Sequence, residues 1–170
     1  MMTPITNIYQ LGNEINFDDF EKKQYFEHIC NLIPNKKAEK LGIEVIDEEK
    51  CNERGVVYAF VIRNKIFKIG QSTDNIKKRI QSYNSGKAEY RTNGTNSITN
   101  YFVLQSFLNL NEIVRVYAYF PPKPTYDIFE QTCCCDSYPP SKRAENIILT
   151  DLIKNHNKKP IGCTQIWNDE

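Results

Sequence analysis

The chain has 170 residues and a net charge of +1, and 40% of its residues are hydrophobic. This is enough for one domain with its own core. No segment approaches the roughly 20 apolar residues that a membrane-spanning helix needs, and the first ten residues lack the basic and apolar parts of a signal peptide. We therefore expect a soluble, cytoplasmic protein that does not contact a membrane.

The cysteines and histidines argue against a zinc site. Three of the six cysteines are consecutive, at positions 133–135, and none lies at zinc-ligand spacing from another cysteine or from His28 or His156. We interpret the cysteines as reduced thiols of an intracellular protein. Because the two histidines are far apart, the sequence also argues against a ββα-metal (HNH) nuclease and against a zinc hydrolase.

An arm and a helix are expected at the N-terminus. Residues 1–16 are polar and favour an extended arm. Asn16 can cap a helix that continues to about Ile33, because Phe26, Ile29 and Ile33 recur at helical spacing and a proline follows.

A β-hairpin is the strongest pattern in the chain. Residues 55–62 are β-branched and aromatic and predict a buried strand, residues 63–65 a tight turn, and residues 66–70 a second strand. A shorter strand is expected before it, at 42–46.

The remaining elements predict an α+β fold. Ser72 or Thr73 is expected to cap a helix whose Ile76 and Ile80 face the core. The rest of the chain predicts, in order, a polar loop at 84–96, a helix at 98–108, a strand at 111–120, an irregular segment at 126–138 and a helix from Pro139 to about Asn155. We expect a three-stranded antiparallel sheet flanked by helices, with residues 51–170 as the core domain and C-terminal tail and residues 1–50 as an N-terminal extension.

Lys68 is a polar residue in the middle of an otherwise apolar strand. If the turn is centred on Asn64, Lys68 lies opposite Phe60 and diagonal to Tyr58 on the same face of the sheet. A turn shifted by one residue would break this relation, and a solvent-exposed lysine is the structural alternative.

Three further positions suggest a site. Arg79 and Tyr83 are one helical turn apart and share a face with Ile80. Glu145 is expected in the first turns of the last helix, where apolar residues three, four and seven positions later place it on the apolar side. A carboxylate there needs a cationic partner or a metal ion.

Together these residues resemble the GIY-YIG nucleases. Val56-Val57-Tyr58 stands at the first motif and Lys68-Ile69-Gly70 at the second, while 78–83 matches the helix with its Arg and Tyr, and Glu145-Asn146 matches the acidic helix. The resemblance covers about residues 55–155. Val56 replaces the first glycine, and a lysine replaces the second tyrosine. The lysine variant is similar to the small type II restriction enzymes of this family, including the type that cuts TCNGA sites.

The resemblance implies a sequence-specific endonuclease that hydrolyses double-stranded DNA. Tyr58 would be the general base, and Lys68 would favour its phenolate. Arg79 and Tyr83 would hold the phosphate. Glu145 would bind one divalent cation, Mg²⁺, for which Mn²⁺ can substitute.

DNA contacts and partners follow from the same resemblance. We expect a homodimer on DNA, with residues 1–50 serving DNA contact or dimerisation, and a cognate DNA methyltransferase as the partner enzyme. The stripe of Phe26, Ile29 and Ile33 is a candidate interface, with core packing as its other use. The residues expected to contact bases or phosphates are Gln71, Ser72, Lys87, Arg91, Asn93 and Asn96.

Two alternatives stay open. Residues 48–50, Glu-Glu-Lys, follow a possible strand like the E-x-K half of a PD-(D/E)xK nuclease, with Asp19 as the required upstream acid, although such tripeptides are common in charged segments. The chain could also be a non-catalytic DNA-binding module on a GIY-YIG scaffold, but such a module would be expected to lack Glu145.

Overall fold

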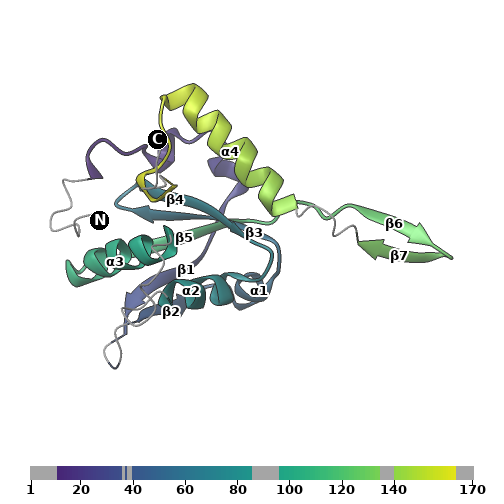
Figure 1. The fold of residues 1–170 in the computed structure, drawn as a ribbon, viewed down its shortest axis with the longest axis horizontal. Helices are drawn as coiled ribbons and strands as arrows, with labels where there is room; N and C mark the ends of the chain where they lie inside the picture. The colour runs from purple at the N-terminus through teal and green to yellow at the C-terminus, as the bar shows by residue number, and fades with distance from the viewer. Residues whose placement is uncertain (1–10, 36, 38–39, 86–95, 135–139, 164–170) are drawn as a thin grey trace.

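A five-stranded antiparallel sheet forms the centre of an α+β fold (Figure 1). The computed structural model describes residues 11–35, 37, 40–85, 96–134 and 140–163. The strands of the sheet, in the order β2-β1-β5-β3-β4, are β1 (Glu27–Pro34), β2 (Leu41–Val45), β3 (Val56–Ile62), β4 (Lys65–Ser72) and β5 (Val114–Tyr119). The α+β class is confirmed, and the expectation of three strands is wrong, since the sheet has five.

Strand β1 accounts for part of the difference, because its residues were expected to be helical. It pairs antiparallel with β2 on one side and with β5 on the other, so Ile29, Cys30 and Leu32 are fully buried. Two short 3₁₀ helices, Phe17–Asp19 and Lys23–Tyr25, precede it. Leu11 and Ile15 are also buried, so the described part of the expected arm packs on the core.

The hairpin of β3 and β4 is confirmed. Arg63 and Asn64 have φ values of 44° and 66°, as a two-residue turn with both central residues left-handed requires. The register places Tyr58 opposite Gly70 and Phe60 opposite Lys68, with an irregularity just after Phe60. Tyr58 and Lys68 therefore share a face of the sheet, as expected.

Helices cover both faces of the sheet (Figure 1). The helices are α1 (Glu48–Asn52), α2 (Ile76–Asn84), α3 (Asn96–Asn109) and α4 (Pro140–His156). Side chains of α1, α2 and α3 enter one core cluster, whereas Ile148 and Leu152 of α4 enter a second cluster with the N-terminal aromatic residues. Helix α2 is capped by Asn75, which accepts from the Lys78 amide, and not by Ser72 or Thr73 as expected.

The segment expected to be irregular contains a second, two-stranded sheet. Strands β6 (Thr125–Ile128) and β7 (Gln131–Cys134) pair with each other and project from the body as an arm (Figure 1). Phe129, at the tip, is 95% exposed.

The structure also bears on the cysteines and on the length of the helices. The cysteines that are described with their side chains, Cys30, Cys51, Cys133 and Cys163, are free thiols. Within the described ranges, every helix is too short or too polar to cross a membrane.

Candidate active site

Three polar side chains from β3 and α2 meet in the core. The phenol oxygens of Tyr58 and Tyr83 are 2.6 Å apart, and Arg79 Nε donates to the Tyr58 oxygen at 3.0 Å. The Arg79 guanidinium also lies over the Tyr83 ring, 4.8 Å from its centroid. Both tyrosines are fully buried. The structure thus brings Tyr58 of the predicted hairpin together with the Arg79 and Tyr83 pair of the following helix.

Gly70 makes room for the Tyr58 ring. A Cβ atom at Gly70 would lie 2.3 Å from the Tyr58 phenol oxygen and 2.4 Å from its Cζ. The ring therefore lies across the backbone of β4, and any side chain at position 70 would displace it. Gly70 belongs to the second motif, but no function for it was predicted from the sequence. A glycine directly opposite a tyrosine in a hairpin is the signal that could have identified its function.

Burial keeps both phenols neutral in the free protein. It raises the pKa of Tyr58, and the Arg79 charge and hydrogen bond oppose this increase. Burial also raises the pKa of Tyr83 well above its ordinary value, and the neighbouring Tyr58 raises it further. Arg79 is the cation that contacts the Tyr58 phenol, and it stabilises the phenolate form.

Lys68 is buried, at 6% exposure, and its amine donates to the Gly162 carbonyl at 2.9 Å. Lys68 had been expected to act mainly on Tyr58, but the hydrogen bond that its amine makes goes to the C-terminal turn. Burial lowers the pKa of the Lys68 amine, and the nearby Cys163 and Glu145 oppose this shift. The buried environment rules out the alternative of a solvent-exposed lysine.

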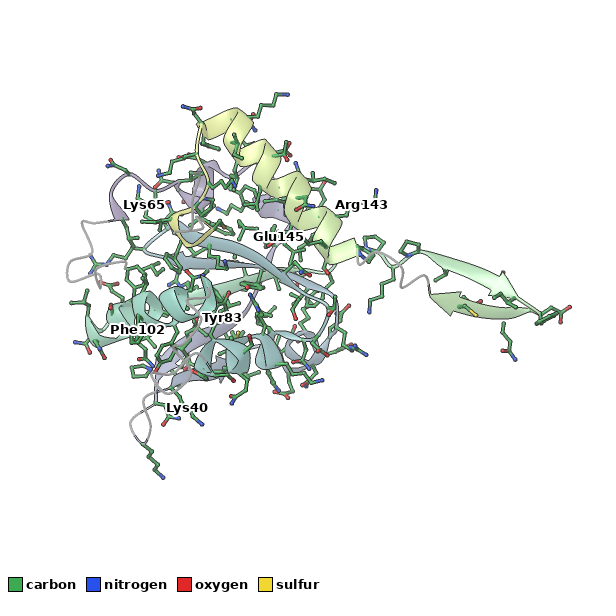
Figure 2. All side chains as sticks on the ribbon, viewed as in Figure 1. Lys40, Lys65, Tyr83, Phe102, Arg143 and Glu145 are labelled. Carbon is green, nitrogen blue, oxygen red and sulfur yellow. The ribbon has the colours of Figure 1, made fainter. Side chains whose placement is uncertain are left out.

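Glu145 lies in the first half of α4, with a side chain that is 14% exposed. Lys142, one turn earlier, forms an ion pair with it at 2.9 Å. The carboxylate is close enough to Tyr58 and Lys68 to raise the pKa of both groups. Figure 2 shows Glu145 on α4 and Tyr83 on α2, on helices that cover opposite faces of the sheet.

The start of α4 is fixed to β4. Ser141 Oγ donates to Gln71 Oε1 at 3.0 Å, and Ser72 Oγ accepts from the Asp74 amide. These bonds give Gln71 and Ser72, which had been selected as candidate DNA contacts, a structural function. Of the other candidates for DNA contact, Lys87, Arg91 and Asn93 lie outside the described residues, as does the side chain of Asn96.

A metal ion here would have few protein ligands. In the described part of the chain, no group of three or more His, Cys, Asp or Glu side chains could hold one. The set assigned from the sequence is one carboxylate, Glu145, and a single hard oxygen donor of this kind is suited to a weakly held Mg²⁺ or Mn²⁺ ion.

The residues of the competing PD-(D/E)xK site are not brought together. The tripeptide at 48–50 lies in helix α1 and not in a strand, and Glu48 forms an ion pair with Lys77. Helix α1 packs into one core cluster through Cys51, whereas Phe17 and Phe20, which flank Asp19, pack into the other. The sheet therefore separates the two parts of that site.

Comparisons with known proteins identify the family. A family model described as the T5orf172 domain matches residues 55–170. The chain belongs to this family. No curated protein matches it significantly.

Two solved structures are similar to this T5orf172 protein. The restriction endonuclease HPY188I in complex with product DNA is 58% identical, with a TM-score of 0.68, and the match covers 96% of this chain and 94% of that chain. A mutant of EndoII of bacteriophage T4 is 18% identical, with a TM-score of 0.58 and coverage of 86% and 98%. The second likeness shows the fold alone. The first confirms the expectation of an enzyme: the chain is a nuclease of the restriction-endonuclease class.

Proposed function

We propose that this protein is a type II restriction endonuclease of the GIY-YIG superfamily that hydrolyses double-stranded DNA at a specific sequence. The buried cluster of Tyr58, Tyr83 and Arg79 is the observation that carries the proposal, because Arg79 Nε donates to the Tyr58 phenol oxygen and the Tyr83 hydroxyl lies within hydrogen-bond distance of it. The likeness to HPY188I supports DNA as the substrate. We further propose TCNGA as the recognition sequence and the cytoplasm as the location.

Tyr58 acts as the general base in this proposal. Hydrolysis needs a group that takes a proton from the attacking water. A Tyr58 phenolate would accept hydrogen bonds from both the Tyr83 hydroxyl and Arg79 Nε, which stabilise its charge. The deprotonated water forms a new bond to the phosphorus atom while one bridging P–O bond breaks, and the departing O3′ or O5′ takes a proton from solvent.

Arg79 and Tyr83 also face the phosphate. The remaining contacts of the Arg79 guanidinium are long, 3.4 Å to Ser82 and 3.5 Å to Tyr83. Its terminal nitrogens can therefore exchange these contacts for a non-bridging phosphate oxygen. Lys68, on the same face of the sheet as Tyr58, adds positive charge near the phenolate.

Glu145 holds the divalent cation in this proposal. Its carboxylate is largely buried and its one ion-pair partner among the described residues, Lys142, is an exposed and mobile type of side chain that an ion can replace. When bound, Mg²⁺ or Mn²⁺ supplies charge neutralisation for the phosphate and the departing oxygen. Because Glu145 is the one carboxylate assigned to the ion, DNA oxygens and water would complete the coordination.

We propose a homodimer on DNA, with the β6–β7 arm as the contact between copies. Of the stripe first considered as the interface, Ile29 is buried in the core, and Phe26 is largely buried but still lines a hollow of the surface. An isolated two-stranded hairpin is only marginally stable in water, and this one exposes Ile128 and Phe129 at its tip. The tip of one copy would dock into an apolar hollow of about 270 Å³ on the other. The hollow is lined by Lys22, Tyr25, Phe26, Tyr119, Ala144, Ile147 and Ile148.

Plasmid cleavage tests the proposed function. Purified protein with Mg²⁺ should linearise a plasmid that carries one TCNGA site and leave a site-free plasmid intact. A cognate methyltransferase that modifies the site should protect it. Binding to DNA without cleavage, in both Mg²⁺ and Mn²⁺, would instead indicate a non-catalytic DNA-binding module.

A further inference from the structure

The C-terminal 3₁₀ turn η5 (Ile161–Cys163) covers the outer edge of β4. The Cys163 thiol accepts from the Ile69 amide at 3.3 Å and donates to the Ile69 carbonyl at 3.0 Å. At its other end, the Ile161 amide donates to the Glu14 carboxylate at 3.2 Å. The turn is thus fixed at both ends, with Gly162 directly beside Lys68.

Two buried donors converge on the Gly162 carbonyl. Lys68 Nζ donates to it at 2.9 Å, and Asn100 Nδ2, from α3, donates at 3.1 Å. Asn100 is 2% exposed. A carbonyl oxygen has two lone pairs, so this acceptor is fully used. The position of the Lys68 amine is consequently set by the turn and by α3 as well as by its own strand.

Only glycine fits at position 162. A Cβ atom there would lie 2.8 Å from the Phe67 carbonyl oxygen and 2.9 Å from Lys68 Cβ. The first of these contacts is with backbone, so a side chain at 162 would move the turn away from β4. The carbonyl would then leave the Lys68 amine.

We propose that Gly162 and Asn100 are positioning residues of the active site, which hold the Lys68 amine in place so that its remaining N–H groups face the reacting phosphate. This inference rests on the proposed function, in which Lys68 acts near Tyr58. The turn η5 and the Asn100 amide would then support catalysis through Lys68. Neither belongs to a motif that the sequence showed.

The charges around Lys68 agree with this positioning. The titratable groups that influence it are Cys163 of η5, Arg79 of α2, and Glu145 and Lys142 of α4. Burial lowers the pKa of the amine, and an acceptor held at hydrogen-bond distance favours its protonated form.

The test combines two substitutions with opposite expected effects on Lys68. Gly162→Ala moves the acceptor carbonyl away from the Lys68 amine, so the pKa of Lys68 should fall. Asn100→Asp, of nearly the same shape, loses the N–H that donates to the Gly162 carbonyl and places a carboxylate near the amine, since both side chains meet the same carbonyl oxygen, so the pKa should rise. NMR titration of isotope-labelled lysines, with the Lys68 signal assigned by its absence in Lys68→Met, measures both shifts without reference to cleavage.

Cleavage kinetics provide the second measurement. Both variants should lower kcat by roughly tenfold or more, with KM for DNA changing much less, as expected when the loss is confined to the transition state. Gly42→Ala is the matched control. Gly42 lies on β2, at the opposite edge of the sheet from β4, and its added Cβ would lie 3.0 Å from the Ile33 carbonyl oxygen. This variant should leave the Lys68 signal and kcat unchanged.

Each outcome decides the inference. Unchanged Lys68 titration in both variants, or an equal loss of activity in Gly42→Ala, would overturn it. If Gly162→Ala fails to fold, the sign of the Asn100→Asp shift still decides. A wild-type protein that cuts no DNA would overturn the proposed function instead, while the titration would still report whether Gly162 and Asn100 hold Lys68.

Discussion

The phenol oxygens of Tyr58 on β3 and Tyr83 on α2 lie 2.6 Å apart in the core, with the Arg79 guanidinium against both. Two neutral phenols in this position need no cation to satisfy their hydrogen bonds. In the proposed mechanism, the arginine stabilises the negative charge that forms when Tyr58 ionises. The predictions below follow from that arrangement.

Gly70→Ala should inactivate the enzyme through Tyr58. The added methyl group would overlap the Tyr58 ring, so the phenol must move away from Tyr83 and Arg79. We expect a loss of stability of about 1–3 kcal/mol, typical of an overpacked core, and a much larger relative loss of cleavage. Thermal unfolding and cleavage rates measure the two effects. If Gly70→Ala cleaves DNA as fast as Gly42→Ala, the position of the Tyr58 ring is not important for cleavage.

Glu145→Gln should abolish Mg²⁺-dependent cleavage and leave DNA binding largely intact. The amide keeps the shape of the side chain but loses the charge that holds the cation. Asp151→Asn, on the same helix, is the control: Asp151 pairs with Lys22, and this variant should cut normally. Substantial cleavage by Glu145→Gln in Mg²⁺ would show that another residue holds the metal.

Phe129→Ser should weaken the dimer without disturbing the core. The side chain is 95% exposed, so the monomer loses no packing. Sedimentation on a cognate duplex should show a shift from two copies to one, and cleavage should change from double-strand cuts to nicks. Ile147→Ser, in the proposed hollow, should have the same effect. Dimers of unchanged stability in both variants would rule out the arm as the contact.

The strands and helices that could be predicted from the sequence are those specified by neighbouring residues. The β3–β4 hairpin follows from two apolar runs around Arg63 and Asn64, and its register placed Lys68 and Tyr58 on one face. Strand β1 could not be predicted in this way, because Phe26, Ile29 and Ile33 also fit a helix. Its pairing with β5, more than 80 positions away, decides the conformation.

In the candidate site, too, the sequence predicted what depends on neighbouring residues and missed a contact between distant ones. Arg79, Tyr83 and Glu145 were found from helical spacing and from the family resemblance. The Gly162 carbonyl was not found, because it meets Lys68 across 94 positions and because a backbone atom has no signature in the sequence. The sequence therefore predicted Lys68 as the cation that acts on Tyr58, whereas the cation that contacts Tyr58 in the structure is Arg79.

Replacing the two cations separately should distinguish their functions. Arg79→Met removes the donor to the Tyr58 oxygen, so the pKa of Tyr58 should rise further and the rate should fall by roughly 10²–10³-fold, as for other lost charge-stabilising donors. Lys68→Met should lower the rate with a smaller shift of the pH profile. A larger shift of the pH–rate profile for Lys68→Met than for Arg79→Met would indicate that the lysine is the main stabiliser of the Tyr58 phenolate.

The pH–rate profile at saturating DNA, measured for the wild type and for Tyr58→Phe, tests the central claim most directly. Burial raises the pKa of Tyr58, so the phenol is protonated at neutral pH and the fraction of active phenolate grows as pH rises. The wild-type rate should therefore increase with pH until the pKa in the DNA complex is reached. Tyr58→Phe keeps the ring but has no group to ionise, so it should lose about 10²–10⁴-fold in rate at every pH. A Tyr58→Phe enzyme that cuts at near wild-type rate, or that keeps the same rise with pH, would contradict the assignment of Tyr58 as the general base.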